Sequence, residues 1–239
     1  VPEAEAKGVK VIYVPDYGTT AVAELVFAGV LNLARDLRRH EKNTLAGRWP
    51  YEQFKKGKKR MYSSTEEVSE EFIKEFTLDG KTLGIVGLGR IGKKVALIAK
   101  YGFGMNVVYF SKTRNTELED KHGYKFVPLE EVMKSEVISL HLSPSAPRGL
   151  ISKEMLSLVK DNAIFVNTSV GHVVDQEALF SELETGRFMA YLEVFDGLPP
   201  RKRLKELKNV LSTYRAGWYT RDSVMRKGDT FIQHLLDYV

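Results

Sequence analysis

A short glycine-rich motif is the feature of this sequence whose residue types most clearly suggest chemistry. Gly87, Gly89 and Gly92 follow an apolar run and precede a stretch in which apolar residues recur at helical spacing. In a strand-turn-helix unit the first glycine permits the tight turn, the second lets the backbone approach a pyrophosphate, and the third lets the helix pack closely on the sheet. The amides at the start of the helix then face the anion. The motif therefore predicts a dinucleotide site, and a glycine-rich turn without a ligand is the alternative.

The end of the next predicted strand bears on which dinucleotide this site would hold. An NAD-selective site places a carboxylate there to accept the ribose hydroxyls, whereas this sequence has Ser111, followed by Lys112, Thr113 and Arg114. A neutral side chain does not repel a 2′-phosphate, and the two cations are suited to pair with it. We therefore expect NADP(H) to bind at least as well as NAD(H). The alternative is that both cations are ordinary surface residues at a strand end.

Alternating strands and helices, from residue 81 to about residue 218, would position these side chains. The hydrophobic pattern predicts strands at Thr82–Val86, Asn106–Phe110, 137–141, 163–167, 189–194 and Val210–Ser212, with helices from residue 91, near 153–158 and at 175–184. Such alternation predicts an α/β fold with a Rossmann-type, doubly wound parallel sheet and flanking helices.

The N-terminal third of the chain has a different pattern. Residues 10–14 are typical of a short strand that ends in a turn, and residues 20–45 of one long helix. Because the apolar stripe of that helix is wide, we expect another domain or another subunit to bury it, and we predict a homodimer. Residues 47–76 are typical of a connection that carries one helix, for which Ser64 and Glu67 form a capping box.

Composition and charge exclude several classes of function. The chain has no cysteine, so disulfides, thiolate metal sites and cysteine nucleophiles are excluded, and no apolar run is long enough to cross a bilayer. We expect a soluble, cytoplasmic protein and no metal site. The formal net charge is +5, with much of the excess in the basic run at 55–60. We interpret that run as a solvated loop rather than a nucleic-acid contact, because no recognition helix or stacking aromatic pattern accompanies it.

Together these motifs resemble the D-isomer-specific 2-hydroxyacid dehydrogenases, the family of phosphoglycerate dehydrogenase and glyoxylate reductase. Besides the glycine motif, the resemblance rests on segments in the family's order and spacing: Phe103-Gly104-Met105, Arg148-Gly149-Leu150-Ile151, Asn167-Thr168, Gly171-His172-Val173-Val174-Asp175 and Asn209-Val210. The family normally begins with most of a flavodoxin-like substrate lobe ahead of the position where this sequence begins. The resemblance thus implies a remnant of that lobe at 1–18, a crossing helix and connection at 19–80, the dinucleotide-binding domain at 81–218 and a C-terminal helix at 219–239.

The resemblance also implies which residues contact the cofactor. Glu193 matches the family aspartate that binds the nicotinamide carboxamide, and Tyr191, where the family has a small residue, would crowd the same end. His141 matches a position beside the adenosine half. The predicted cofactor-binding residues are Gly87, Gly89, Arg90, Ile91, Gly92, Ser111, Lys112, Thr113, Arg114, His141, Leu142, Thr168, Ser169 and Glu193.

The family's catalytic positions carry different residue types here. Family members reduce a 2-keto acid with a histidine as general acid, a glutamate that orients it and an arginine that clamps the substrate carboxylate. The corresponding positions are Val170 for the arginine, Leu198 for the glutamate and Arg215 for the histidine. A valine does not bind a carboxylate, a leucine does not polarise an acid, and an arginine does not exchange a proton near neutral pH. We therefore expect weak or no hydride transfer.

Two alternatives remain open. An active 2-keto acid reductase with a remodelled site would use Arg215 for the carboxylate and Tyr214 or His172 as the acid, although His172 follows a turn glycine and is more typical of an exposed turn. A nucleotide-gated interaction protein, resembling the C-terminal-binding corepressors, would use the same fold without catalysis.

Overall fold

The structure, a computed structural model, describes residues 2–11, 13–47 and 75–237. The basic run at 55–60 and the predicted capping box of Ser64 and Glu67 lie outside these residues. No helix among the described residues is long and apolar enough to span a membrane. In the same part of the chain, no group of three or more histidine, aspartate and glutamate residues is arranged to hold a metal ion.

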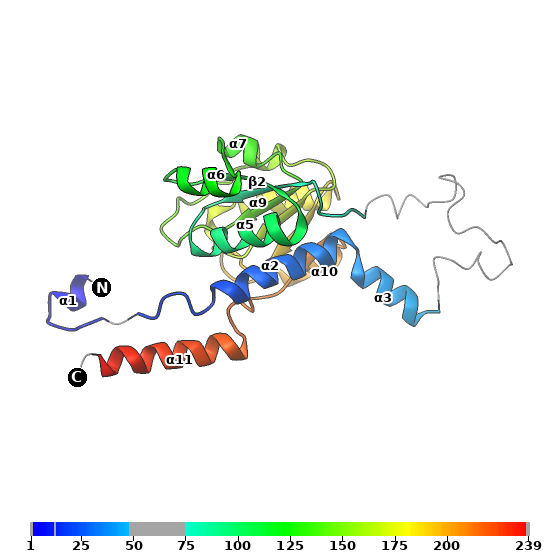
Figure 1. The fold of residues 1–239 in the computed structure, drawn as a ribbon. Coiled ribbons are helices and arrows are strands. Elements are labelled where there is room, and N and C mark those ends of the chain that lie inside the picture. The colour runs from blue at the N-terminus through cyan, green and yellow to red at the C-terminus, as the bar shows by residue number, and fades with distance from the viewer. Residues whose placement is uncertain (1, 12, 48–74, 238–239) are drawn as a thin grey trace.

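A seven-stranded sheet forms the centre of the molecule, with the order β3-β2-β1-β4-β5-β6-β7. Every pair of neighbouring strands is parallel. The strands are β1 (Thr82–Val86), β2 (Asn106–Phe110), β3 (Lys125–Phe126), β4 (Val137–Leu140), β5 (Ile164–Asn167), β6 (Met189–Leu192) and β7 (Val210–Ser212). The predicted Rossmann-type α/β fold is thus confirmed (Figure 1). Because the strand order reverses between β1 and β4, a ligand crevice is expected outside the carboxyl ends of these two strands.

Two long helices cover one face of the sheet. Both α2 (Thr19–Ala34) and α5 (Arg90–Phe103) contribute to one buried cluster, in which Phe27 stacks on Phe103 with ring centroids 4.9 Å apart. The bounds of α5 follow from its glycines: Gly89 is the N-cap, and Gly104 takes a left-handed conformation with φ 64° at the C-cap.

Shorter helices cover the opposite face and the sheet edge. The α7 (Leu129–Val132), α8 (Lys153–Ser157) and α9 (Gln176–Glu184) helices bury their apolar side chains in a second cluster. The side chain of Asp175 caps α9 by accepting from the amide of Ala178 at 3.0 Å. The α10 helix (Arg201–Glu206) and the 3₁₀ turn η3 (Gly171–Val173) pack against this second cluster, whereas α6 (Thr116–His122) packs Leu118 against the first.

The predicted helix over 20–45 is wrong in one respect, because the chain forms two helices there. The α2 helix ends before Asp36, which has a φ of 40° and caps α3 (Leu37–Leu45) by accepting from the amide of Arg39 at 3.4 Å. A short polar side chain that tolerates the left-handed region favours such a break. The apolar stripe of α2 is buried within the chain, against α5 and the sheet, so it does not require a second subunit.

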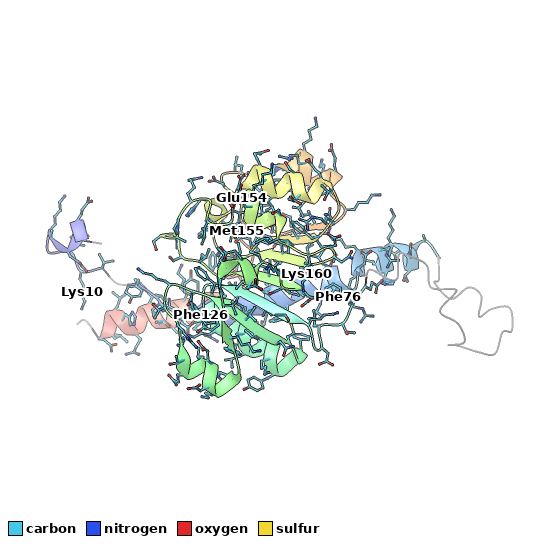
Figure 2. All side chains as sticks on the ribbon, turned by 90° about the horizontal axis from the view of Figure 1, so that it is seen from above. Lys10, Phe76, Phe126, Glu154, Met155 and Lys160 are labelled. Atoms are coloured by element: carbon cyan, nitrogen blue, oxygen red, sulfur yellow. The ribbon has the colours of Figure 1, made fainter. Side chains whose placement is uncertain are left out.

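The predicted strand at 10–14 is also wrong, because none of its described residues belongs to a strand. The chain begins with the short α1 helix (Pro2–Glu5), and Lys10 lies away from the sheet (Figure 2). Without a partner strand, this segment cannot satisfy its backbone groups in a ladder. The α11 helix (Arg221–Leu236) lies at the same end of the molecule, where the amine of Lys227 is 5.4 Å from the ring centroid of Tyr17 (Figure 1).

Candidate functional site

The glycine motif forms a tight turn directly after β1, at the point where the strand order reverses. Gly87 has a φ of 98°, and its amide donates to the carbonyl of Phe110 on β2 at 2.8 Å. A Cβ at Gly87 would lie 2.5 Å from the carbonyl oxygen of His141, and a Cβ at Gly92 would overlap the carbonyl oxygen of Gly87. Both glycines are therefore required by close approach of backbone to backbone, as the spacing predicts.

Gly89 differs from its two neighbours in the motif. It is exposed, has an extended backbone (φ −76°, ψ −164°), and a Cβ built on it would meet nothing within 4 Å. The fold itself therefore does not need a glycine here, whereas a ligand that packs on this backbone does. The free amides at the start of α5 are at the same place, and they suit an anionic group such as a pyrophosphate.

Thr168 adds a second observation that favours a bound ligand at this edge. Its hydroxyl oxygen is buried and has no hydrogen-bond partner, at the carboxyl end of β5. A buried unpaired hydroxyl is unfavourable unless a bound group satisfies it. The ribose hydroxyls and amide of a dinucleotide offer such partners, so the residues present fit a dinucleotide that extends from the glycine motif toward β5.

The four residues after β2 form the end of the site predicted to hold the adenosine. Ser111 donates to the carbonyl of Thr113 at 2.5 Å, and Lys112 is exposed. Arg114 is paired with Glu119 of α6, with its Nη2 2.7 Å and its Nε 3.0 Å from the two carboxylate oxygens. This pairing holds the pKa of Glu119 below its usual value. Sequence reasoning did not find this partner, which leaves Nη1 of Arg114 to meet a phosphate.

His141 follows β4 and adjoins the glycine motif. Its amide donates to the carbonyl of Val86 at 2.8 Å, and its Nε2 is 2.9 Å from the hydroxyl of Ser139. Burial lowers the pKa of His141 to about 3, so the ring is neutral at ordinary pH. The predicted neighbour Leu142 also lies here, because its Cδ2 is 3.4 Å from the position of a Cβ on Gly87.

The three predicted catalytic positions lie on loops after β5, β6 and β7, so the fold brings them to the same carboxyl edge of the sheet. Val170 is half-buried, and the side chain of Asn167 fixes its loop by donating to the Val170 carbonyl at 3.0 Å. Leu198 is exposed over 83% of its surface. Arg215 is exposed and has a left-handed backbone with φ 55°. These three side chains contain neither a proton donor for a carbonyl nor a carboxylate to orient one.

A cavity of about 420 Å³ lies beside the loops after β5 and β6, and most of the residues that line it are polar or charged. Arg148 forms an ion pair with Asp196, and His172 lines the same cavity with its Nε2 3.2 Å from the carbonyl oxygen of Ala146. Gly171 makes the arrangement possible, because a Cβ there would overlap the backbone of Phe195. His172 is therefore half-buried rather than an exposed turn residue. Sequence reasoning named Arg148 only as part of a family segment and did not pair it with Asp196, because the two residues lie 48 positions apart.

Glu193 is buried, with 3% of its surface exposed, and its carboxylate is already engaged by the loop after β7. It accepts hydrogen bonds from the Thr213 hydroxyl at 3.0 Å, the Ala216 amide at 2.8 Å and the Gly217 amide at 3.1 Å. The predicted contact with the nicotinamide carboxamide stays a prediction. Tyr191 directs its ring toward α2, where a Cβ on Gly29 would overlap it.

Comparison with known proteins agrees with this geometry. Residues 27–214 match the domain described as D-isomer specific 2-hydroxyacid dehydrogenase, NAD binding domain. The chain is 37% identical over 227 residues to a glyoxylate reductase of Thermococcus litoralis, covering 93% of this chain and 65% of that protein. It is 32% identical over 243 residues to a hydroxypyruvate reductase of Thermotoga maritima, covering 98% of this chain and 72% of that protein. The chain thus spans about two thirds of the length of these relatives.

Solved structures of similar fold contain bound dinucleotides. An acyclic imino acid reductase, Bsp5, in complex with NADPH and D-Arg superposes with a TM-score of 0.80 at 26% identity, over 99% of this chain and 70% of that one. A D-lactate dehydrogenase from Aquifex aeolicus, complexed with NAD and lactic acid, superposes with a TM-score of 0.78 at 27% identity, over 99% of this chain and 71% of that one. The matched domain and these neighbours assign a nicotinamide dinucleotide as the cofactor.

Proposed function

Because this chain belongs to the D-isomer specific 2-hydroxyacid dehydrogenase family, we propose that it binds a nicotinamide dinucleotide but transfers hydride to 2-keto acids weakly or not at all. The observation that carries the proposal is the residue set at the three catalytic positions, Val170, Leu198 and Arg215. The glycine motif and the unpaired Thr168 hydroxyl support retention of the cofactor site.

The chemistry of the family explains why this residue set matters. A reduced nicotinamide, when bound, would supply the hydride. The negative charge that hydride transfer leaves on the carbonyl oxygen would have to be neutralised by a positioned acid. Arg215 can offset that charge electrostatically, but it does not deliver a proton near neutral pH. Loss of one catalytic group commonly costs orders of magnitude in rate, and several losses do not simply add. We therefore expect residual activity at most.

A cofactor-oxidation assay tests this proposal directly. The chain is incubated with NADPH or NADH and, in turn, glyoxylate, pyruvate and hydroxypyruvate, while a separate titration establishes that the cofactor binds. Negligible oxidation with intact cofactor binding is the expected result. Turnover of about one per second or faster, the range of ordinary enzymes, would refute the proposal.

We further propose that NADP(H) binds at least as tightly as NAD(H). Ser111 places no negative charge at the end of β2, and Lys112 presents an exposed amine. Arg114 contributes only its remaining donors, because Glu119 occupies two of its nitrogens. Calorimetric titration with both cofactors is the test, and a clear preference for NAD(H) would contradict the proposal.

A reductase with a remodelled site is the second candidate. It is favoured by the position of Arg215, an exposed cation on the loop after β7 at the carboxyl edge of the sheet. Such an enzyme would bind the substrate carboxylate at Arg215, and the assay above would detect its turnover. The nucleotide-gated interaction protein stays a prediction, since the basic run at 55–60 lies outside the described residues.

The predicted homodimer also belongs among the proposals. The stripe on α2 no longer supports it, but α3 has no buried residue and exposes Leu37 over 51% and Leu45 over 82% of their surfaces. We propose that α3 contributes to a contact between two copies of the chain. Light scattering at micromolar concentration tests this, and a strictly monomeric species would refute it. A cytoplasmic location stays a prediction from the composition.

A further inference from the structure

The loop after β7 is built around a single buried carboxylate. Three donors of this loop converge on Glu193: the hydroxyl of Thr213 and the amides of Ala216 and Gly217, at 3.0, 2.8 and 3.1 Å. A buried carboxylate is stable only when such donors satisfy its oxygens. Glu193 therefore fixes both sides of Arg215, the residue in the middle of the loop.

The backbone of Arg215 is held in a conformation that it would rarely adopt alone. Its φ is 55°, in the left-handed region, and its amide donates to the carbonyl of Glu193 at 3.1 Å. Such a conformation persists in a residue other than glycine when the surroundings determine it. Gly217 allows the loop to close, because a Cβ there would lie 2.5 Å from a carboxylate oxygen of Glu193.

A second hydrogen bond connects this arrangement to the core of the sheet. The hydroxyl of Tyr191 is 2.8 Å from the hydroxyl of Thr213, which donates to Glu193. Burial raises the pKa of Tyr191, so its hydroxyl stays protonated. Tyr191 belongs to β6 and Glu193 follows it directly, and β6 is paired on both sides, with β5 and with β7. The loop is thus anchored on a rigid element rather than on other loops.

We propose that Glu193 is a positioning residue, which holds the 213–217 loop so that Arg215 is presented at the carboxyl edge of the sheet as the binding group for a ligand carboxylate. This inference rests on the use of Arg215 in the second candidate function. When the backbone of Arg215 is held in one conformation, its side chain binds a carboxylate with a smaller loss of conformational entropy than it would from a mobile loop.

The length of the Glu193 side chain makes the inference testable. An aspartate, the residue that the family resemblance places here, withdraws the carboxylate by about 1.5 Å, the length of one carbon–carbon bond. The bonds to Ala216 and Gly217, now 2.8 and 3.1 Å, then exceed hydrogen-bond distance. If the carboxylate instead served a bound nicotinamide, the same withdrawal would lengthen that contact and weaken NADPH binding.

The experiment measures binding of oxalate to the full chain saturated with NADPH, by calorimetry. Glu193→Asp and Arg215→Ala are each expected to weaken oxalate binding about 10-fold or more, the loss of roughly one charge-assisted contact. NADPH affinity is expected to stay within about 2-fold of the original chain. Glu130→Asp, the same shortening at an exposed residue of α7, serves as the matched control and is expected to change neither affinity.

Trp218 lies next to the 213–217 loop, so its fluorescence reports how well the loop is ordered without any ligand being present. With Trp49→Phe as the background, Glu193→Asp is expected to increase acrylamide quenching of Trp218. Unchanged quenching together with unchanged oxalate affinity overturns the positioning role of Glu193. Weaker NADPH binding with normal oxalate binding also overturns it, since Glu193 would then serve the cofactor. If oxalate does not bind the original chain, or binds Arg215→Ala equally well, Arg215 is not the binding group for a carboxylate. In that case the acrylamide quenching of Trp218 still shows whether Glu193 holds the loop.

Discussion

Single alanine substitutions in and near the glycine motif should separate the glycines that the fold needs from the glycine that the ligand needs. A Cβ at position 92 would overlap the Gly87 carbonyl oxygen, and it would lie 3.4 Å from the Ile85 side chain. A Cβ at position 89 meets nothing within 4 Å, and one at position 102, also in α5, meets only the Ile98 side chain at 3.7 Å. The three substitutions add the same methyl group to one helix or its N-cap, so they form a matched set.

The expected magnitudes follow from these contacts. Overpacking of backbone against backbone costs about 1–3 kcal/mol, and the higher helix propensity of alanine offsets about 1 kcal/mol of this in Gly92→Ala. A net loss of up to about 2 kcal/mol corresponds to a Tm lower by up to roughly 8 °C in a chain of this size. Gly102→Ala keeps the propensity gain without the clash, so its Tm should rise by about 2–4 °C. Gly89→Ala loses a moderately good N-cap residue, and its Tm should fall by about 2 °C at most.

Cofactor titration supplies the second half of the assay. Gly89→Ala should raise the Kd for NADPH about 10-fold or more, because its methyl group occupies the position where a pyrophosphate approaches the backbone. Gly102→Ala should leave the Kd unchanged. Thermal unfolding followed by circular dichroism and calorimetric titration provide both measurements. If Gly89→Ala binds NADPH as well as the original chain, or if Gly92→Ala is as stable as Gly102→Ala, the reasoning about this motif is refuted.

Three further predictions concern charged and titrating residues. Lys112→Ala should weaken NADPH binding about 10-fold and leave NADH binding unchanged. Arg114→Ala should weaken NADPH binding less, because the guanidinium already forms an ion pair with Glu119. Equal effects of Lys112→Ala on NADPH and NADH binding would contradict the prediction. His141 has a native pKa of about 3 against an unfolded value of 6.5, so the unfolded chain binds the extra proton. The stability that depends on a neutral His141 is fully present above pH 6.5 and decreases as the pH falls toward 3. At pH 5 the free energy of unfolding should be lower by up to about 2 kcal/mol than above pH 6.5. Urea unfolding of His141→Gln should show a smaller decrease between pH 6.5 and 5. Asp36→Ala should lower the free energy of unfolding by about 1–2 kcal/mol, because it removes the N-cap of α3 and a residue that tolerates the left-handed region. Chemical denaturation measures this change. An unchanged free energy of unfolding would show that α3 does not depend on the cap.

Local patterns in the sequence were sufficient for six of the seven strands and for the glycine motif, whereas the two-residue strand β3 was not predicted. The inner strands β1, β4, β5 and β6 are buried along nearly their whole length and therefore appear as largely apolar runs. Gly87 and Gly92 have the spacing that is typical of a strand-turn-helix unit. Some signals were present but not used. Asn115 and Gly123 cap α6 in the usual way, through a side-chain bond to the amide of Leu118 at 3.0 Å and a left-handed C-cap.

Other features depended on contacts between distant segments. The apolar stripe of α2 predicted burial, but only the tertiary structure showed that α5 and the sheet provide it within one chain. The pattern at 10–14 has strand propensity, yet a strand requires a partner, and none is present among the described residues.

The candidate site shows most clearly which features the sequence determines and which the tertiary structure determines. The sequence by itself indicated a dinucleotide motif, and the family resemblance predicted Val170, Leu198 and Arg215 at the catalytic positions. Residue identity alone fixes which of these groups can bind a charge or move a proton. Only the tertiary structure decided which groups are already engaged, such as Glu193 by the loop after β7 and Arg114 by Glu119. A side chain can form a limited number of hydrogen bonds, and folding determines which partners, often far apart in sequence, occupy them.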